Sequence, residues 1–396
     1  VPPFGFLSTV NQLAGYSFGS GNGDPIGTSN FVQAVQLPDF PVADLSWETS
    51  RTINFGFDGV FLNNSLNFTA EYYQRRTIDI LQESELPQSV GNRFDPTLNL
   101  AEVLNTGFEF VAGYNNSVGD FSYGISANIT TVNNEVLEVF NDQPFGGQND
   151  RVEEGFPIDY LWGFKVGGIF QSQQEIDDYY ETFDDQQANR ELIRPGDFWF
   201  QDVHGDPSED EPFYSQTPDS VVNLNDRTFI GNTIPGHFYG FNFNASWKGF
   251  DASIFFQGVG DVQRNNGDLR RRVGMAGLGN SQDVSVQNRW TVEQPNTWNP
   301  DDPANSLPRA VRSDPASNNR FSDRFVQNAG FMRLRNLEIG YSLPQTLMDR
   351  LGFVQNFRIY VGGSNLLTFT QWEGNDPEND NIPIPQVYTI GLNASF

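Results

Sequence analysis

The groups that could carry out acid–base or nucleophilic chemistry are unevenly supplied in this chain. Fifty residues are aspartate or glutamate, whereas His204 and His237 are the only imidazoles and cysteine is absent. Paired carboxylates could hydrolyse a glycosidic bond, but no spacing singles out one pair among so many acids. The chain also lacks His-Glu-x-x-His and a phosphate-binding glycine loop that ends in lysine. The sequence therefore does not predict an enzyme.

Charge and composition exclude further classes of protein. The formal net charge is −27, and Lys165 and Lys248 are the only lysines. Nucleic acid needs a basic surface, so it is not an expected partner. Without cysteine there is no disulfide framework, zinc thiolate site or thiol nucleophile. No run approaches eighteen apolar residues, so the sequence predicts no transmembrane helix.

The last eleven residues alternate strictly between an apolar and a polar face. Tyr388, Leu392 and Phe396 share the apolar face, and Asn393 lies on the polar one. A strand of about ten residues is long enough to cross a bilayer when it is tilted, with one face toward lipid and the other toward a lumen. This pattern predicts an outer-membrane β-barrel.

The same period of two recurs along most of the chain. It predicts nine strands, with one further strand before Ser46 as an option. The nine expected strands are 52–62, 66–80, 102–114, 121–129, 239–247, 250–256, 331–343, 357–363 and 386–396. The predicted fold class is all-β, a transmembrane antiparallel barrel.

The connections between these strands alternate in length. Short turns are expected at 63–65, 115–120 and 248–249, whereas about 133–237 and about 259–330 are long loops. Barrels in outer membranes combine short periplasmic turns with long extracellular loops. The connection at 344–355 is intermediate in length, and its leucine spacing predicts a helix.

Stretches spread over the chain resemble one known family. Arg194-Pro195-Gly196-Asp197 and Asp376-Pro377-Glu378 are two short examples. The other resembling stretches are 44–50, 54–58, 71–81, 225–235, 331–344 and 363–370. Together they resemble SusC/RagA-type TonB-dependent transporters of the outer membrane of Bacteroidetes.

That resemblance implies the chain's place in a larger protein. The family has a barrel of about 22 strands around an amino-terminal plug. Residues 1–396 resemble the carboxy-terminal part of such a barrel, and the plug and the segment that contacts TonB are absent. Since Val1 is not followed by a signal peptide, we expect this chain to be part of a longer exported protein.

Partners and location are further implications of the resemblance. They are a SusD-like surface lipoprotein, TonB acting through the missing amino-terminal part, the barrel assembly machinery, membrane lipid, and a glycan or peptide substrate. The expected location is the outer membrane, which the chain would cross many times. By similarity, Phe396, Leu392 and Tyr388 form the signal that the assembly machinery recognises.

The resemblance also implies a metal site. The family's central loop carries Asp-x-Asn-x-Asp-Gly and a later Asp, spaced like a calcium loop. Here Asp202, Asp206 and Asp226 take the acidic positions, but His204 replaces the Asn and Pro207 replaces the Gly. About eighteen residues separate Pro207 from Asp226, which departs from the roughly twelve-residue loop of such a site. The alternative is a solvated acidic loop. No cofactor is required for transport, and calcium or magnesium in this loop is the one candidate.

Four tryptophans in the predicted outer loops could contact ligand or partner through their ring faces: Trp199, Trp290, Trp298 and Trp372. The alternative is that they pack the long loops against each other.

The function that the sequence predicts is TonB-dependent import of a large nutrient with a SusD-like lid. One alternative is a passive porin, which would need neither plug nor energy. The other is a secreted glycan-binding or adhesion β protein, which would remain soluble without detergent.

Overall fold

A computed structural model describes residues 45–83, 97–273, 288–302, 305–311, 314–352, 354–379 and 382–396, and four two-residue strands before residue 45. Those strands pair as β1 (Asn11–Gln12) with β4 (Val35–Gln36) and β2 (Tyr16–Ser17) with β3 (Phe31–Val32). None of the described helices has the length and apolar character needed to cross a membrane.

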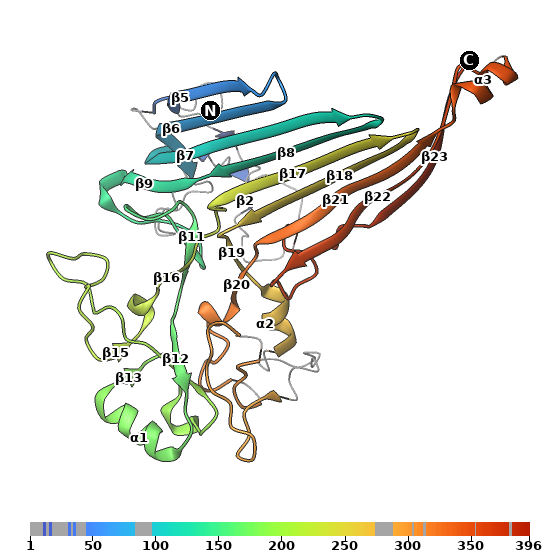
Figure 1. Ribbon diagram of the computed structural model, residues 1–396. Coiled ribbons are helices and arrows are strands. Elements are labelled where there is room, and N and C mark those ends of the chain that lie inside the picture. Colours follow the sequence, from blue (N-terminus) through green and yellow to red (C-terminus); the bar gives the residue numbers. More distant parts are fainter. Residues whose placement is uncertain are drawn as a thin grey trace.

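Within the described residues, ten strands form one large antiparallel sheet (Figure 1). Nine of them lie side by side in chain order. These are β5 (Thr49–Phe61), β6 (Leu66–Glu83), β7 (Thr97–Val118), β8 (Phe121–Thr131), β17 (His237–Trp247), β18 (Phe250–Gly260), β21 (Phe331–Ser342), β22 (Asn356–Thr370) and β23 (Val387–Ser395). The nine predicted strands and the predicted antiparallel fold are confirmed.

The tenth strand, β9 (Asn133–Val139), was expected to be part of a loop. It pairs with β7 from Ala101 to Thr106, while β8 pairs with the rest of that long strand from Glu109 to Val118. Val136 and Val139 of β9 are buried and pack against Val103. The sheet therefore extends six to seven residues into the segment predicted as a loop.

The register places apolar side chains in line across neighbouring strands. Ile125 lies opposite Phe243, which in turn lies opposite Ile254. One residue along, Ser126 lies opposite Asn242. The apolar face is exposed over a wide area, with Phe55 at 69% and Ile390 at 82% exposure. An exposed apolar face of this extent is typical of a surface that contacts lipid.

Short turns lie at one end of the sheet and long segments at the other (Figure 1). The turn after β5 is possible because Leu62, Asn63 and Asn64 adopt positive φ, and the turn after β17 uses Gly249 at φ 89°. A Cβ on Gly249 would lie 2.7 Å from the Ser342 carbonyl oxygen, so a larger residue would not fit. The helix α3 (Gln345–Leu351) connects β21 to β22 at this end, as predicted.

The long segments contain short elements that fold outside the sheet. Their strands are β10 (Asp150–Arg151), β11 (Tyr160–Gly163), β12 (Val166–Ile169), β13 (Asp184–Asp185), β14 (Phe198–Phe200), β15 (Val221–Val222), β16 (Thr228–Gly231), β19 (Gln263–Asn265) and β20 (Val326–Asn328). Their helices are α1 (Gln173–Thr182) and α2 (Gly267–Val273), with 3-10 turns η2 (Phe140–Asp142), η3 (Arg190–Leu192), η4 (Leu224–Asp226) and η6 (Asp323–Phe325).

Candidate functional site

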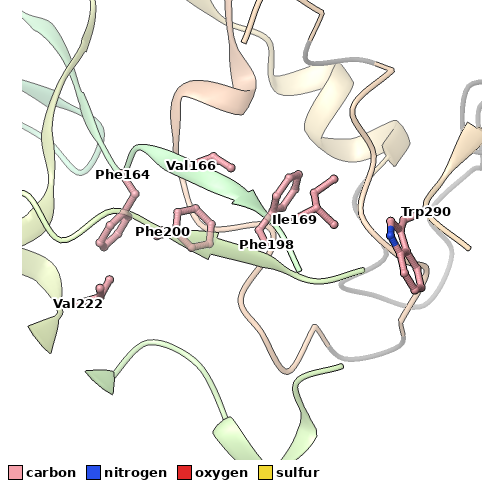
Figure 2. Packing of buried hydrophobic residues seen from close by; sticks show 7 residues of the cluster. All are labelled: Phe164, Val166, Ile169, Phe198, Phe200, Val222 and Trp290. Atoms are coloured by element: carbon pink, nitrogen blue, oxygen red, sulfur yellow. The ribbon is translucent and has the colours of Figure 1, made fainter. Parts of the chain in front are cut away.

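The two long segments fold together into one unit, here called the loop body: residues 140–236 and the described part of 261–330. A shared apolar cluster joins them (Figure 2). It contains Phe164, Val166, Ile169, Phe198, Phe200 and Val222 from the first segment and Trp290 from the second. A second cluster places Ala316 of the second segment against Ile176 and Ile193 of the first. The loop body therefore has its own core.

Backbone hydrogen bonds also cross between the segments. Phe164 donates to the Phe321 carbonyl at 3.0 Å, and Asp323 donates back to the Phe164 carbonyl at 3.0 Å. Arg309 donates to the Gly196 carbonyl at 2.7 Å. These bonds satisfy buried backbone groups. Displacing either segment would therefore leave backbone donors and acceptors of the other without partners.

An ion pair between Asp197 and Arg309 also joins the two segments. Asp197 is fully buried, and both of its oxygens accept from Arg309, Oδ1 from Nε and Oδ2 from Nη2, each at 2.8 Å. Asn318 Nδ2 and the Arg194 backbone N–H complete the set of donors to this carboxylate. Asp197 ends the Arg-Pro-Gly-Asp stretch noted in the sequence, so that motif has a structural role in joining the segments.

A second buried ion pair crosses the same interface. Arg320 binds Asp185 through Nη1 and Nη2, at 3.2 and 2.9 Å. Its guanidinium carbon also lies 4.0 Å from the centre of the Phe200 ring. A planar guanidinium suits both contacts because it can bind a carboxylate edge-on and stack on a ring with its face.

The predicted metal ligands lie close together but contact protein donors. Asp226 is fully buried, and its oxygens accept from the backbone N–H groups of Val203, His204 and Asn223 at 2.7 to 3.1 Å. Asp202 accepts from the Ser220 N–H at 2.7 Å. Burial, and to a lesser degree the neighbouring Asp226, raises the pKa of Asp202.

Asp206 completes this arrangement by accepting from the Asn225 side-chain amide at 3.0 Å. Among the described residues there is no group of three or more histidine or acidic side chains that could hold a metal ion. The carboxylates instead hold 202–206 against 219–226, the structural role of a capped turn. Calcium or magnesium at Asp202, Asp206 and Asp226 stays a prediction from the resemblance alone.

His204, which takes the place of the expected Asn, packs among aromatic rings. Its ring centre lies 4.3 Å from that of Tyr214, and Nδ1 lies 3.0 Å from the Asn225 carbonyl oxygen. Burial lowers the pKa of His204. The neutral ring therefore predominates at neutral pH.

The four tryptophans pack within the protein. Trp290 and Trp372 are 7% and 6% exposed. Trp298 packs against the cluster of Figure 2, and Trp199 lies over Gly167, where a Cβ would meet its ring at 1.9 Å. The alternative of loop packing thus describes their present contacts, and contact with ligand or partner stays a prediction.

The terminal strand presents its apolar side chains outward. Tyr388, Leu392 and Phe396 are 74%, 66% and 76% exposed. Leu392 lies opposite Ile359 of β22, so the strand is held in the sheet by a regular ladder. The role of these three residues in assembly stays a prediction.

The residues that join distant segments were missed by sequence reasoning. Asp197 and Arg309 are 112 positions apart, and nothing in their local patterns indicates the pairing. The one signal was the Arg-Pro-Gly-Asp stretch, which the resemblance singled out without a role.

The fold and the loop body define a segment of an antiparallel membrane β-barrel. No family model matches the chain. Over 396 aligned residues, covering 92% of the chain, it is 29% identical to TonB-dependent receptor P3 of Formosa agariphila. It is 23% identical over 372 residues to TonB-dependent receptor SusC of Bacteroides thetaiotaomicron. The chain spans about a third of these relatives, 36% and 32% of their lengths.

A solved structure agrees in fold. The RagAB peptide importer in its open-open state matches 100% of the chain and 38% of its own chain, with a TM-score of 0.75 and 22% identity. These findings confirm the resemblance to SusC/RagA-type TonB-dependent transporters. The curated relatives are named as receptors, which agrees with the expectation that the chain is not an enzyme.

Proposed function

We propose that the protein containing this chain is an outer-membrane importer of the SusC type that takes up a glycan or a peptide. Energy would come from TonB through a part outside this chain, and a SusD-like surface lipoprotein would act as the lid. The observation that carries the proposal is a membrane-type sheet whose long connections fold into one body at a single end. Such a body suits capture of a solute at the mouth of a barrel.

The polar face of the sheet supports passage of a hydrated solute. A hollow of about 540 Å³ lies on it near the short turns, lined by the polar side chains Asn115, Ser122, Asn244, Ser246, Asp251 and Ser253. Groups of this kind hydrogen-bond to sugars and peptides alike, so they fit either substrate class.

The loop body supplies a surface for the lid. Val292, Leu224 and Leu192 are apolar yet 80%, 60% and 49% exposed. Exposed apolar side chains at a protein surface are favourable when a partner covers them. We place the lipoprotein on this surface.

Deleting one loop would not test this placement, because the loops share a core and removal of either would expose the other. Single substitutions on the surface avoid that problem. Val292→Glu and Leu224→Glu should reduce co-purification of the lipoprotein and substrate uptake, with an unchanged amount of folded barrel. Leu347→Glu on α3, at the opposite end, is the matched control. Equal retention of lipoprotein by all three variants would place the lid elsewhere.

Energy dependence separates this proposal from its alternatives. Uptake by the complete protein should be saturable and should stop in cells without TonB. Non-saturable uptake that continues without TonB would indicate a porin. A protein that stays monomeric and soluble without detergent would indicate the secreted alternative.

A further inference from the structure

Two phenylalanines lie on the polar face of the sheet. Phe255 of β18 lies directly opposite Asn242 of β17 in the ladder, and Phe238 lies on β17 four positions before Asn242. Alternate positions on a strand share a face, as do residues paired across a ladder, so both rings lie on the side of Asn242. Phe238 is 42% exposed there. The polar face therefore presents aromatic surface among its amides and hydroxyls.

Both rings line a hollow of about 480 Å³ together with the side-chain amides of Asn128, Asn242 and Gln257. In the register Gly240 lies between Asn128 and Gln257. A Cβ on Gly240 would lie 2.4 Å from Asn128 Oδ1 and 3.6 Å from Phe255 Cε2, so an amide and a ring converge above this glycine. Sites for small molecules combine aromatic walls with a few polar groups in this way.

The amides of the hollow have hydrogen-bonding capacity to spare. Within the described part of the chain, the side chains of Asn128 and Asn242 have no hydrogen-bond partner. Gln257 is held at its oxygen, because Arg335 Nε donates to Oε1 at 3.2 Å, and Arg335 is itself bound to both oxygens of Glu378 at 2.9 and 3.0 Å. This leaves the amide nitrogen of Gln257 as a donor. An amide can donate and accept, as a hydroxyl can, so these groups match a ligand rich in hydroxyls.

The charge of the hollow favours a neutral ligand. Among the described residues, no charged side chain lines it, although the chain has a net charge of −27. A charged group that left water to enter this hollow would find no opposite charge there, which is costly.

The arrangement of the amides favours a ring over an extended chain. Neighbouring strands lie about 4.8 Å apart, and alternate residues on a strand about 6.6 Å apart. Asn128 and Gln257 are therefore on opposite sides of Gly240, and Asn242 is one alternate position along β17. Polar groups that surround a point match hydroxyls around a sugar ring better than peptide groups spaced along a line.

This hollow adjoins the one of about 540 Å³ described above. Asn242 lines the first and Asn244, the next residue of β17 on the same face, lines the second. Both hollows lie on β8, β17 and β18, which are side by side in Figure 1, the first nearer the long segments and the second nearer the short turns. A solute that leaves the first hollow thus has a polar surface ahead of it.

We propose that the hollow around Gly240 binds a neutral sugar ring. The carbon-bound hydrogens of the sugar pack on Phe238 and Phe255, and its hydroxyls hydrogen-bond to the three amides. This inference rests on the proposed function, because it names a neutral glycan as the solute that passes this face. Binding needs neither TonB nor the lipoprotein, so the two can fail separately. Uptake without TonB would overturn the proposed function and leave the site, whereas absence of binding would overturn the site alone.

The test is a saturation-transfer NMR titration of the complete protein in an amine-oxide detergent, which has no sugar headgroup. The probes are the methyl glycosides of glucose, galactose, mannose and xylose, and at least one should bind saturably. The methyl glycoside of glucuronate, which is charged, should bind more weakly than the best of the four. So should N-acetylalanine methylamide, a neutral peptide unit.

Two variants locate the binding. Phe255→Leu keeps an apolar side chain but removes the ring, and Asn242→Ala removes one amide. Each should weaken binding of the best glycoside by about threefold to tenfold. Phe369→Leu on β22 and Asn393→Ala on β23 are the matched controls outside the hollow and should bind as the parent protein does.

Three results would overturn the proposal. They are no saturable binding of any of the four glycosides by the parent protein, equal or tighter binding of glucuronate or the peptide unit, and unchanged affinity in either variant. Tighter binding of the peptide unit would indicate a peptide site instead. If one variant does not assemble, the other decides the question, and if neither assembles, the comparison of the probes on the parent protein decides it.

Discussion

Nη2 of Arg333 donates to Oδ2 of Asp376 at 2.6 Å, and this bond ties the connection between β22 and β23 to β21, the third strand from one edge of the sheet. Arg333 is fully buried on β21, and Nη1 donates to Glu378 at 2.6 Å while Nε donates to Thr368 at 2.9 Å. Two stretches that the resemblance singled out separately, 331–344 and 376–378, thus meet in one network.

Removing one partner of this network should destabilise the connection between β22 and β23, residues 371–386. Asp376→Asn leaves Arg333 buried with less compensating charge, and breaking a buried pair typically costs about 3–5 kcal/mol. We expect cleavage by protease within 371–386 at a lower protease concentration than in the parent protein. Arg350→Gln on the exposed surface of α3 is the control, and equal resistance of Asp376→Asn and the parent would contradict the assignment.

The pair of Asp197 and Arg309 should be strongly coupled. In a double-mutant cycle with Asp197→Ala and Arg309→Ala, we expect a coupling energy within the range of about 0.5–3 kcal/mol seen for contacting residues, and near its upper end. Urea unfolding of the loop body, followed by tryptophan fluorescence, provides the measurement. The pair of Asp268 and Arg271 on α2, in which the Arg271 side chain is exposed, is the control and should couple weakly. Similar coupling in both pairs would argue against a special role for Asp197.

Asp323 should make the stability of the loop body depend on pH. Burial raises its pKa to about 6 from 3.8, although Oδ1 accepts from the Val166 N–H at 3.1 Å. The folded state therefore holds the proton more tightly than the unfolded state. Protonated Asp323 therefore contributes about 3 kcal/mol to the free energy of unfolding. This contribution is complete below pH 4 and is lost as the pH rises from about 4 through 6.

The substitution Asp323→Asn tests this dependence because it imitates the protonated acid. The variant should match the parent at pH 4 and exceed it in urea midpoint at pH 7. Asp349→Asn on α3 is the control for loss of a carboxylate. Identical pH profiles of Asp323→Asn and the parent protein would show that Asp323 does not titrate in this range.

Much of the sheet could be predicted because each strand lies between two different environments. In β17, Phe243 faces away from Asn242 and Asn244, and this alternation is visible in the sequence without any knowledge of neighbours. The strand β9 was missed because Val136 and Val139 are three positions apart, and its ladder with β7 shifts register between Glu102 and Val103. Such a shift breaks the period of two.

The loop body could not be predicted in the same way. Its core and ion pairs join residues more than a hundred positions apart, such as Asp185 and Arg320, and local periodicity carries no information about such contacts. The tryptophans show the same limit. A ring that stacks on a ligand and a ring that packs on Gly167 have the same sequence signal.

Substitutions on the two faces of the sheet should differ in cost. Ile125→Arg or Leu392→Arg places a charge on the apolar face and should cost about 2–4 kcal/mol near the midplane of the bilayer. Ser126→Arg and Asn393→Arg, on the polar face, are the matched controls and should be tolerated. Folding into liposomes measures the difference, and equal sensitivity of both faces would indicate a soluble sandwich.

Deletion of Phe396 should reduce assembly of the barrel without weakening the folded sheet. The residue lies beyond the last ladder pair, Ser395 with Asn356, so the deletion leaves the pairing of β23 intact. It removes a 76% exposed aromatic side chain that continues the apolar face of Tyr388 and Leu392. If that face is the assembly signal, less heat-modifiable barrel should reach the outer-membrane fraction, while the assembled molecules should melt as the parent does.

Phe369→Ala, which removes a 54% exposed aromatic from β22, is the control and should assemble normally. An undiminished amount of barrel after deletion of Phe396 would show that the signal lies elsewhere.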